Sequence, residues 1–80
     1  MTTVNLTRVH LQRLQGAVEA ALAGARIHFR VNCGEPRTIV WVDERTPTTQ
    51  HTVMSVWGDP CLPLAVVEEK FREMVCEARS

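Results

Sequence analysis

The stretch TIVWVDERTPTTQHTVMSVW, from Thr38 to Trp57, decides the fold of this chain. It contains two runs rich in β-branched and aromatic residues, Thr38 to Asp43 and His51 to Trp57, on either side of a polar segment that holds Pro47. Such runs around a polar loop predict two strands of an antiparallel sheet. Neither run alternates strictly between apolar and polar residues, as expected for a strand with one buried and one solvent-exposed face. The sequence therefore raises the question of what covers the second face of the sheet.

The segment before this stretch predicts a further strand. Arg26 to Cys33 reads RIHFRVNC and alternates strictly between apolar and polar residues. Gly34 to Arg37 then predicts a turn, because proline presets one backbone dihedral and glycine tolerates a positive one. One face of this strand carries Ile27, Phe29, Val31 and Cys33, and the other carries Arg26, His28, Arg30 and Asn32.

Two helices are expected to flank the strands. From Asn5 to Ala23 the apolar residues fall three or four positions apart, with Asn5 or Thr3 as the expected N-cap. A second apolar stripe begins after Pro63 and runs almost to the end of the chain. The order α-β-β-β-α predicts a single α+β domain over residues 1–80, with a three-stranded antiparallel sheet and both helices packed mainly on one face.

Composition limits the classes of function. The chain has 80 residues, of which 45% are hydrophobic and 22% charged, as in an ordinary globular domain. Its formal net charge is zero, so the long-range field that draws proteins onto bulk nucleic acid or anionic lipid is missing. No apolar run approaches the roughly 18 residues of a membrane span. We expect no membrane partner and regard nucleic acid as a poor fit.

Three cysteines, Cys33, Cys61 and Cys76, follow no C-x-x-C spacing. An odd number of such cysteines predicts free, mostly buried thiols in a reducing compartment, so we expect a cytoplasmic protein. Their separations, even together with His51, match no known zinc motif. We therefore expect no metal and no cofactor.

The length of the turn between the first two expected strands determines which of their residues lie opposite each other. If Gly34 to Arg37 forms a four-residue loop, Cys33 lies opposite Thr38 and His28 lies opposite Asp43. The face that the helices leave bare then becomes an apolar patch with a charged border, which is typical of a partner-binding surface. Its predicted partner-binding residues are Trp41, Ile39, Met54 and Val56, bordered by Arg30, Arg26 and His28.

Two other arrangements stay open at this point. One helix on each face would bury both faces and leave a self-sufficient monomer. A one-residue slip in the strand from Thr38 to Asp43 would exchange its two faces. A bare apolar face would equally suit a homodimeric accessory subunit.

Catalysis has little support in the sequence. His28 opposite Asp43, with Arg26 and Arg30 on the same face, could form an acid–base site for RNA cleavage. A surface pair of this kind is more commonly a weak ion pair. We therefore expect no catalytic residues and no enzyme activity.

The α-β-β-β-α order is shared with double-stranded RNA-binding domains and with the HicA family of mRNA-cleaving toxins. The toxin family's Gly-Ser-His strand motif has no match in Ala25-Arg26-Ile27-His28, and the lysine-rich helix end of the RNA-binding domains is absent. A nucleic-acid-binding module or toxin-like ribonuclease is nevertheless the alternative function.

In size, single compact domain, near-neutral charge and lack of a catalytic motif, the chain resembles the small anti-CRISPR inhibitors of phages and other mobile elements. The resemblance implies a protein of the host cytoplasm that blocks a CRISPR RNA-guided surveillance complex by stoichiometric binding. Those inhibitors share no common signature, so the resemblance assigns no functional position here.

Overall fold

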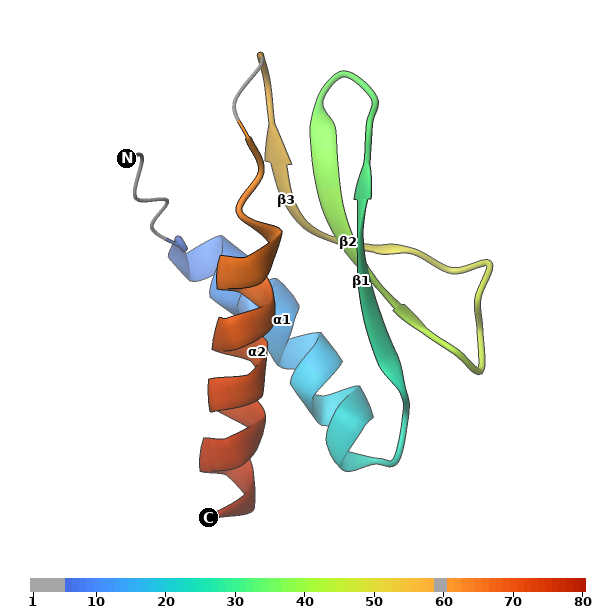
Figure 1. Cartoon of the computed structure of the whole chain (residues 1–80). Coiled ribbons are helices and arrows are strands. Elements are labelled where there is room, and N and C mark those ends of the chain that lie inside the picture. Colours follow the sequence, from blue (N-terminus) through green and yellow to red (C-terminus); the bar gives the residue numbers. More distant parts are fainter. Residues whose placement is uncertain (1–5, 59–60) are drawn as a thin grey trace.

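A computed structural model describes residues 6–58 and 61–80 of the chain (Figure 1). The elements follow the predicted order, and each strand boundary lies within one residue of its predicted position. They are α1 (Arg8–Leu22), β1 (Ile27–Asn32), β2 (Arg37–Asp43), β3 (His51–Val56) and α2 (Leu64–Arg79). The strands form one antiparallel sheet in the order β1-β2-β3.

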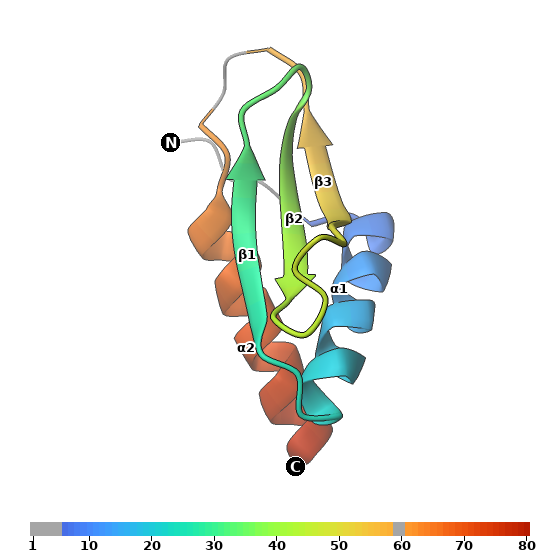
Figure 2. The same ribbon diagram turned by 90° about the vertical axis from the view of Figure 1, so that its right-hand side faces the viewer.

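Both helices lie on the same side of the sheet, as Figures 1 and 2 show from two directions. In Figure 2 the three strands stand in front of α1 and α2, and the β2–β3 loop folds toward the viewer. The α+β class and the packing of both helices on one face are thus confirmed. The alternative with one helix on each face is wrong.

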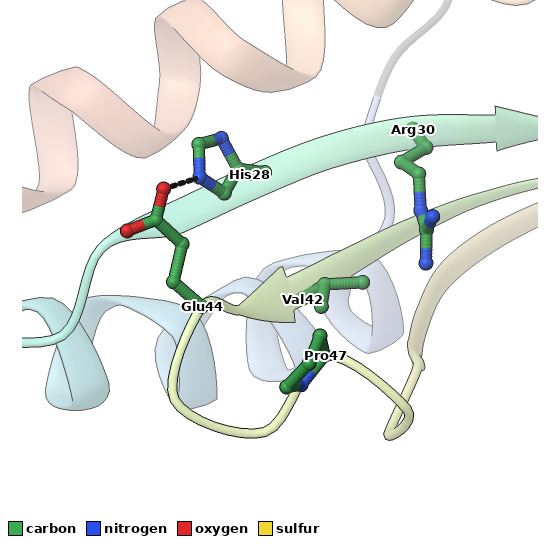
Figure 3. A pocket seen from close by; sticks show the side chains of 5 residues that line it. All are labelled: His28, Arg30, Val42, Glu44 and Pro47. Atoms are coloured by element: carbon green, nitrogen blue, oxygen red, sulfur yellow. Dashed lines mark hydrogen bonds and ion pairs between the residues drawn. The ribbon is translucent and has the colours of Figure 1, made fainter.

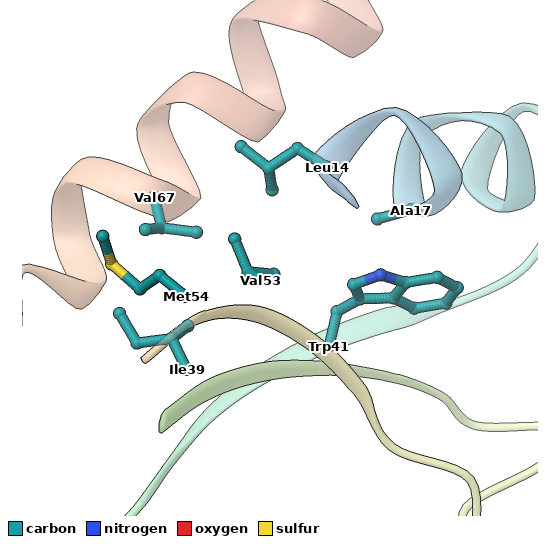
Figure 4. Close-up of a cluster of buried hydrophobic side chains, with 7 residues drawn as sticks. All are labelled: Leu14, Ala17, Ile39, Trp41, Val53, Met54 and Val67. Atoms are coloured by element: carbon teal, nitrogen blue, oxygen red, sulfur yellow. The ribbon is translucent and has the colours of Figure 1, made fainter. Parts of the chain in front are cut away.

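The core fills the space between this helix layer and the sheet. Figure 4 shows side chains from α1, α2, β2 and β3 meeting there. Leu14, Ile39, Val53 and Val67 are completely shielded from solvent. The buried cluster consists of Leu14, Ala17, Ile39, Trp41, Val53, Met54 and Val67.

The first hairpin has a different register from the predicted one. Asn32, not Cys33, lies opposite Thr38, so five residues, Cys33 to Arg37, separate the paired positions. The extra residue shifts β2 by one position against β1. Because side chains alternate between faces, this shift exchanges the two faces of β2. His28 lies opposite Val42, and the predicted pair of His28 with Asp43 is wrong.

The face exchange corrects the predicted binding patch. Ile39 and Trp41 lie on the helix-covered face, and Met54 joins them because β3 pairs it with Ile39. Ile39 is 0% exposed, Met54 2% and Trp41 8%, so none of the three offers a surface to a partner. Val56 is half-buried opposite Arg37, on the same side by strand alternation. The predicted apolar patch is therefore part of the domain's own core.

Helix α1 begins at a capping box that the sequence analysis missed. Its N-cap is Thr7, whose hydroxyl accepts a hydrogen bond from the His10 backbone N–H at 3.3 Å. The Thr7 backbone N–H donates in return to His10 Nδ1 at 3.1 Å. The two expected caps, Thr3 and Asn5, lie outside the described residues. Since Nδ1 accepts a hydrogen bond from the backbone, this cap requires a neutral imidazole that carries no proton on that nitrogen.

This cap predicts a pH-dependent stability. Burial and the nearby charge of Arg13 lower the pKa of His10 below its ordinary value of 6.5. The unfolded chain then binds more protons, so the contribution of the cap is present above pH 6.5 and is lost as the pH falls through the folded-state pKa. We predict a loss of up to about 1 kcal/mol, the usual value of a helix cap. Urea unfolding at pH 8 and pH 5 measures it, with His10→Gln as control.

Glutamine suits this capping position and does not titrate, so His10→Gln should reduce the pH dependence of unfolding relative to the unsubstituted protein. Equal pH dependence in both proteins would contradict the role of His10. Because the two proteins differ only at residue 10, the difference between their two pH profiles reports on the cap.

Gly16 lies in the middle of α1 and its neighbour is a side chain of β2. A Cβ built at Gly16 would lie 3.6 Å from Trp41 Cζ2, an ordinary van der Waals distance. An alanine therefore fits. We predict that Gly16→Ala stabilises the domain by about 0.5 to 1 kcal/mol, since glycine is a poor residue inside a helix. Chemical denaturation measures the gain, and a loss of stability would show that the contact with Trp41 is tighter than this.

Candidate interaction face

The sheet face opposite the helices is polar at its surface with a small apolar floor. Val40 and Val42 form the floor, yet they are only 2% and 6% exposed. On the same face, Asn32 Nδ2 donates to Gln50 Oε1 at 2.8 Å and joins β1 to the residue before β3. By register and strand alternation, this uncovered face carries Arg26, His28, Arg30, Asn32, Thr38, Val40, Val42, Thr52 and Ser55. It is not the bare apolar patch that the sequence analysis expected.

A shallow hollow of about 280 Å³ lies at one end of this face (Figure 3). Val42 forms part of its apolar lining, and Pro47 from the β2–β3 loop lies across from it. His28 Nε2 contacts Glu44 Oε1 at 2.6 Å, which ties β1 to the start of that loop. Arg30 also lines the hollow.

The first strand supplies the free positive charge of this face. Arg26 and Arg30 are exposed and make no ion pair or side-chain hydrogen bond within the part of the chain that the structure describes. The imidazole of His28 is occupied by Glu44. The guanidinium groups of Arg30 on β1 and of Arg26, directly before it, therefore remain available to an anionic partner, since arginine pairs well with carboxylates.

Asp43 does not take part in acid–base chemistry with His28. Its carboxylate binds the guanidinium of Arg45 through two oxygens, at 2.8 to 3.2 Å, and also accepts the Arg45 backbone N–H at 2.9 Å. These hydrogen bonds lower the pKa of Asp43, so it stays ionised. The pair fixes the start of the β2–β3 loop, a structural role that the sequence analysis did not foresee.

Trp57 is 71% exposed. It directly follows β3, whose last residue Val56 pairs with Arg37. Trp57 therefore lies at the end of the sheet near the β1–β2 turn. An exposed tryptophan is a common anchor residue of protein interfaces.

The cysteines correct another expectation. Cys33, Cys61 and Cys76 are free, as predicted, but all three are exposed and not buried. Within residues 6–58 and 61–80, no three histidine, cysteine or acidic side chains come together as metal ligands. No helix in the same ranges is long and apolar enough to cross a membrane.

Of the seven predicted partner-binding residues, the structure leaves Arg26, His28 and Arg30 exposed on one face. Sequence reasoning missed Glu44, Pro47 and Gln50, which shape that face from the β2–β3 loop. No periodic pattern marks loop residues, so only the fold of the loop reveals them. No protein family, curated protein or solved structure matches the chain.

Proposed function

We propose that this chain is a non-catalytic inhibitor that binds a larger protein complex through the cationic side of its uncovered sheet face. The observation that carries this proposal is the pair Arg26, directly before β1, and Arg30 on β1, both exposed without an acidic partner in the described part of the chain. Exposed arginines that a domain does not neutralise itself are suited to pair with a partner's carboxylates.

The proposed target is a CRISPR RNA-guided surveillance complex, which is the partner implied by the resemblance of the chain to small anti-CRISPR inhibitors. The proposed compartment is the cytoplasm, because three exposed free thiols suit a reducing environment. Inhibition would follow because the protein, bound to acidic groups of the complex, sterically blocks the path of target DNA.

A direct nucleic-acid-binding function has less support. His28 is tied to Glu44 and Arg45 is tied to Asp43, so few cations on this face remain for phosphates. Affinity for nucleic acid grows with the number of neutralised phosphates, and two arginines supply little of it. Binding to a labelled oligonucleotide that falls steeply with added salt would favour this alternative.

The experiment is a titration of purified surveillance complexes of several types with this protein, with binding of target DNA as the readout. We predict a linear loss of DNA binding that reaches its end point at a fixed number of inhibitor copies per complex. Arg30→Glu should weaken inhibition at least tenfold, because it replaces an attraction to acidic groups by repulsion. Arg72→Glu, at an exposed position of α2, is the charge-matched control and should leave inhibition unchanged.

Two results would contradict the proposal. If no complex is inhibited, the target class is wrong. If far fewer copies than complexes suffice for full inactivation, the protein turns over and is an enzyme. Circular dichroism of both variants verifies that the substituted proteins are folded.

A further inference from the structure

We propose that β1 is a docking edge to which the partner protein adds a strand, with acidic side chains toward the uncovered face and apolar side chains toward α2. This inference rests on the proposed function, because it specifies how the partner would be bound. Its support comes from the backbone, the apolar packing and the charge of β1.

The outer edge of β1 carries backbone groups that the domain does not use. The Glu44 N–H donates to the Arg26 carbonyl at 3.0 Å, which sets the hydrogen-bonding phase of the β1–β2 ladder. In an antiparallel pair, alternate residues turn their backbone groups toward the neighbouring strand. Ile27, Phe29 and Val31 therefore point their N–H and C=O groups outward, and none of these groups has a hydrogen bond within the described residues. They form a ready template for another strand.

The opposite edge of the sheet is protected in a way that β1 is not. The β2–β3 register shifts between Ile39 and Val40, which leaves Val53 as an extra residue in β3. In addition, Arg13 of α1 donates to the Val53 carbonyl at 3.4 Å. Bulges and covering side chains are the usual devices that prevent strand addition at an edge. The β1–β2 pairing has a continuous register over all six residues of β1.

The apolar core is incomplete along β1. The central helix-facing residues of β2 and β3 are buried, whereas Ile27, Phe29 and Val31 are only partly buried. Phe29 packs edge-on against Phe71 of α2 at 5.1 Å between ring centroids, and Phe71 is also only partly buried. A strand beside β1 would place its own apolar side chains over this seam. Strand addition at such an edge combines backbone hydrogen bonds with specific side-chain contacts.

The positive charge beside β1 indicates which kind of strand could bind at its outer edge. An added strand would bring its alternate side chains next to Arg26 and Arg30 on the uncovered face, so acidic residues at those positions fit. A second copy of this chain fits poorly. If β1 paired antiparallel with β1 of a second copy, with Phe29 opposite Phe29, the Arg26 and Arg30 side chains of both copies would lie close together on one face. The second β1 strand would bring no acidic side chain to neutralise them. Like charges at such spacing repel.

The test uses a peptide with the proposed pattern, acetyl-Glu-Val-Glu-Ile-Glu-Val-Glu-amide, and a control peptide with lysine in place of every glutamate. Hydrogen exchange followed by NMR reports on each backbone amide. In the free protein, the amides of Ile27, Phe29 and Val31 should exchange rapidly. With saturating acidic peptide their exchange should slow at least tenfold, and the lysine peptide should have no effect.

A matched pair of variants tests the backbone contribution. Val31→Pro removes one outward N–H that the β1–β2 ladder does not use, and Val31→Ala shortens the side chain while keeping that N–H. We expect the proline variant to bind the acidic peptide at least tenfold more weakly than the alanine variant. Equal binding by two folded variants would contradict strand addition.

The outcomes separate this inference from the proposed function. If the three amides stay unprotected with peptide, β1 is not a docking edge, even if the protein inhibits a surveillance complex. If the amides are protected by peptide but no complex is inhibited, strand binding stands and the proposed target fails. Protection that grows with protein concentration alone, together with a dimer mass in sedimentation, would identify a second copy as the occupant and overturn the acidic partner strand.

Discussion

Replacing Trp41 with alanine should destabilise the domain by about 3 to 5 kcal/mol, the range for removing a large aromatic side chain from a core. Trp41 is 8% exposed, stacks on His51 with ring centroids 4.0 Å apart, and lies under Gly16 of α1. Its removal would leave a cavity between helix and sheet. A domain of this size has only about 5 to 15 kcal/mol of stability, so the variant should be largely unfolded on mild warming. Thermal and urea unfolding measure the loss.

The matched control is the second tryptophan. Trp57 is 71% exposed and outside the core cluster, so Trp57→Ala should change the free energy of unfolding by less than about 0.5 kcal/mol. The chain has two tryptophans, so in this variant the fluorescence reports on Trp41 alone. Its emission should be that of a buried indole and should shift to the red on unfolding. Similar losses for both substitutions would contradict the assignment of Trp41 to the core and Trp57 to the surface.

Periodicity was sufficient to predict the elements of this fold. The strict alternation of Arg26 to Cys33 and the apolar stripe after Pro63 are signals within single elements, and both elements form close to their predicted limits. The class and the packing of both helices on one face followed from the order of elements. Local patterns thus determined what each segment becomes.

The pairing between strands could not be read in the same way. It depends on the turn, and the sequence GEPR allows the paired strands to be separated by four residues or by five. In the structure Cys33 belongs to the turn, and that single residue moves Trp41 from the predicted surface to the core. Apolar residues of β2 point to both faces of the sheet, so either face could lie under the helices. The sequence of β2 therefore could not decide between the two registers. A surface site predicted from the faces of a strand is therefore correct only if the pairing register of that strand is correct.

The register itself predicts a difference between two neighbouring residues. Ile39→Thr and Val40→Thr both place threonine in β2 and keep a β-branched side chain, so strand propensity is nearly unchanged. Ile39 is 0% exposed beneath the helices, and a threonine in its place would bury a hydroxyl among apolar side chains. The lost packing and the buried hydroxyl should together cost about 2 to 4 kcal/mol.

Val40 faces the other side, where its neighbours are polar. It lies opposite Arg30 on β1 and Thr52 on β3, both of them exposed to solvent. A hydroxyl at this position has the polar Thr52 as its cross-strand neighbour, so Val40→Thr should cost about 1 kcal/mol or less. Urea unfolding of the two variants compares the two faces directly. The register with Cys33 opposite Thr38 would reverse the order, because it places Val40 under the helices and Ile39 on the open face. A larger loss for Val40→Thr would therefore contradict the pairing of Asn32 with Thr38 and, with it, the identity of the uncovered face.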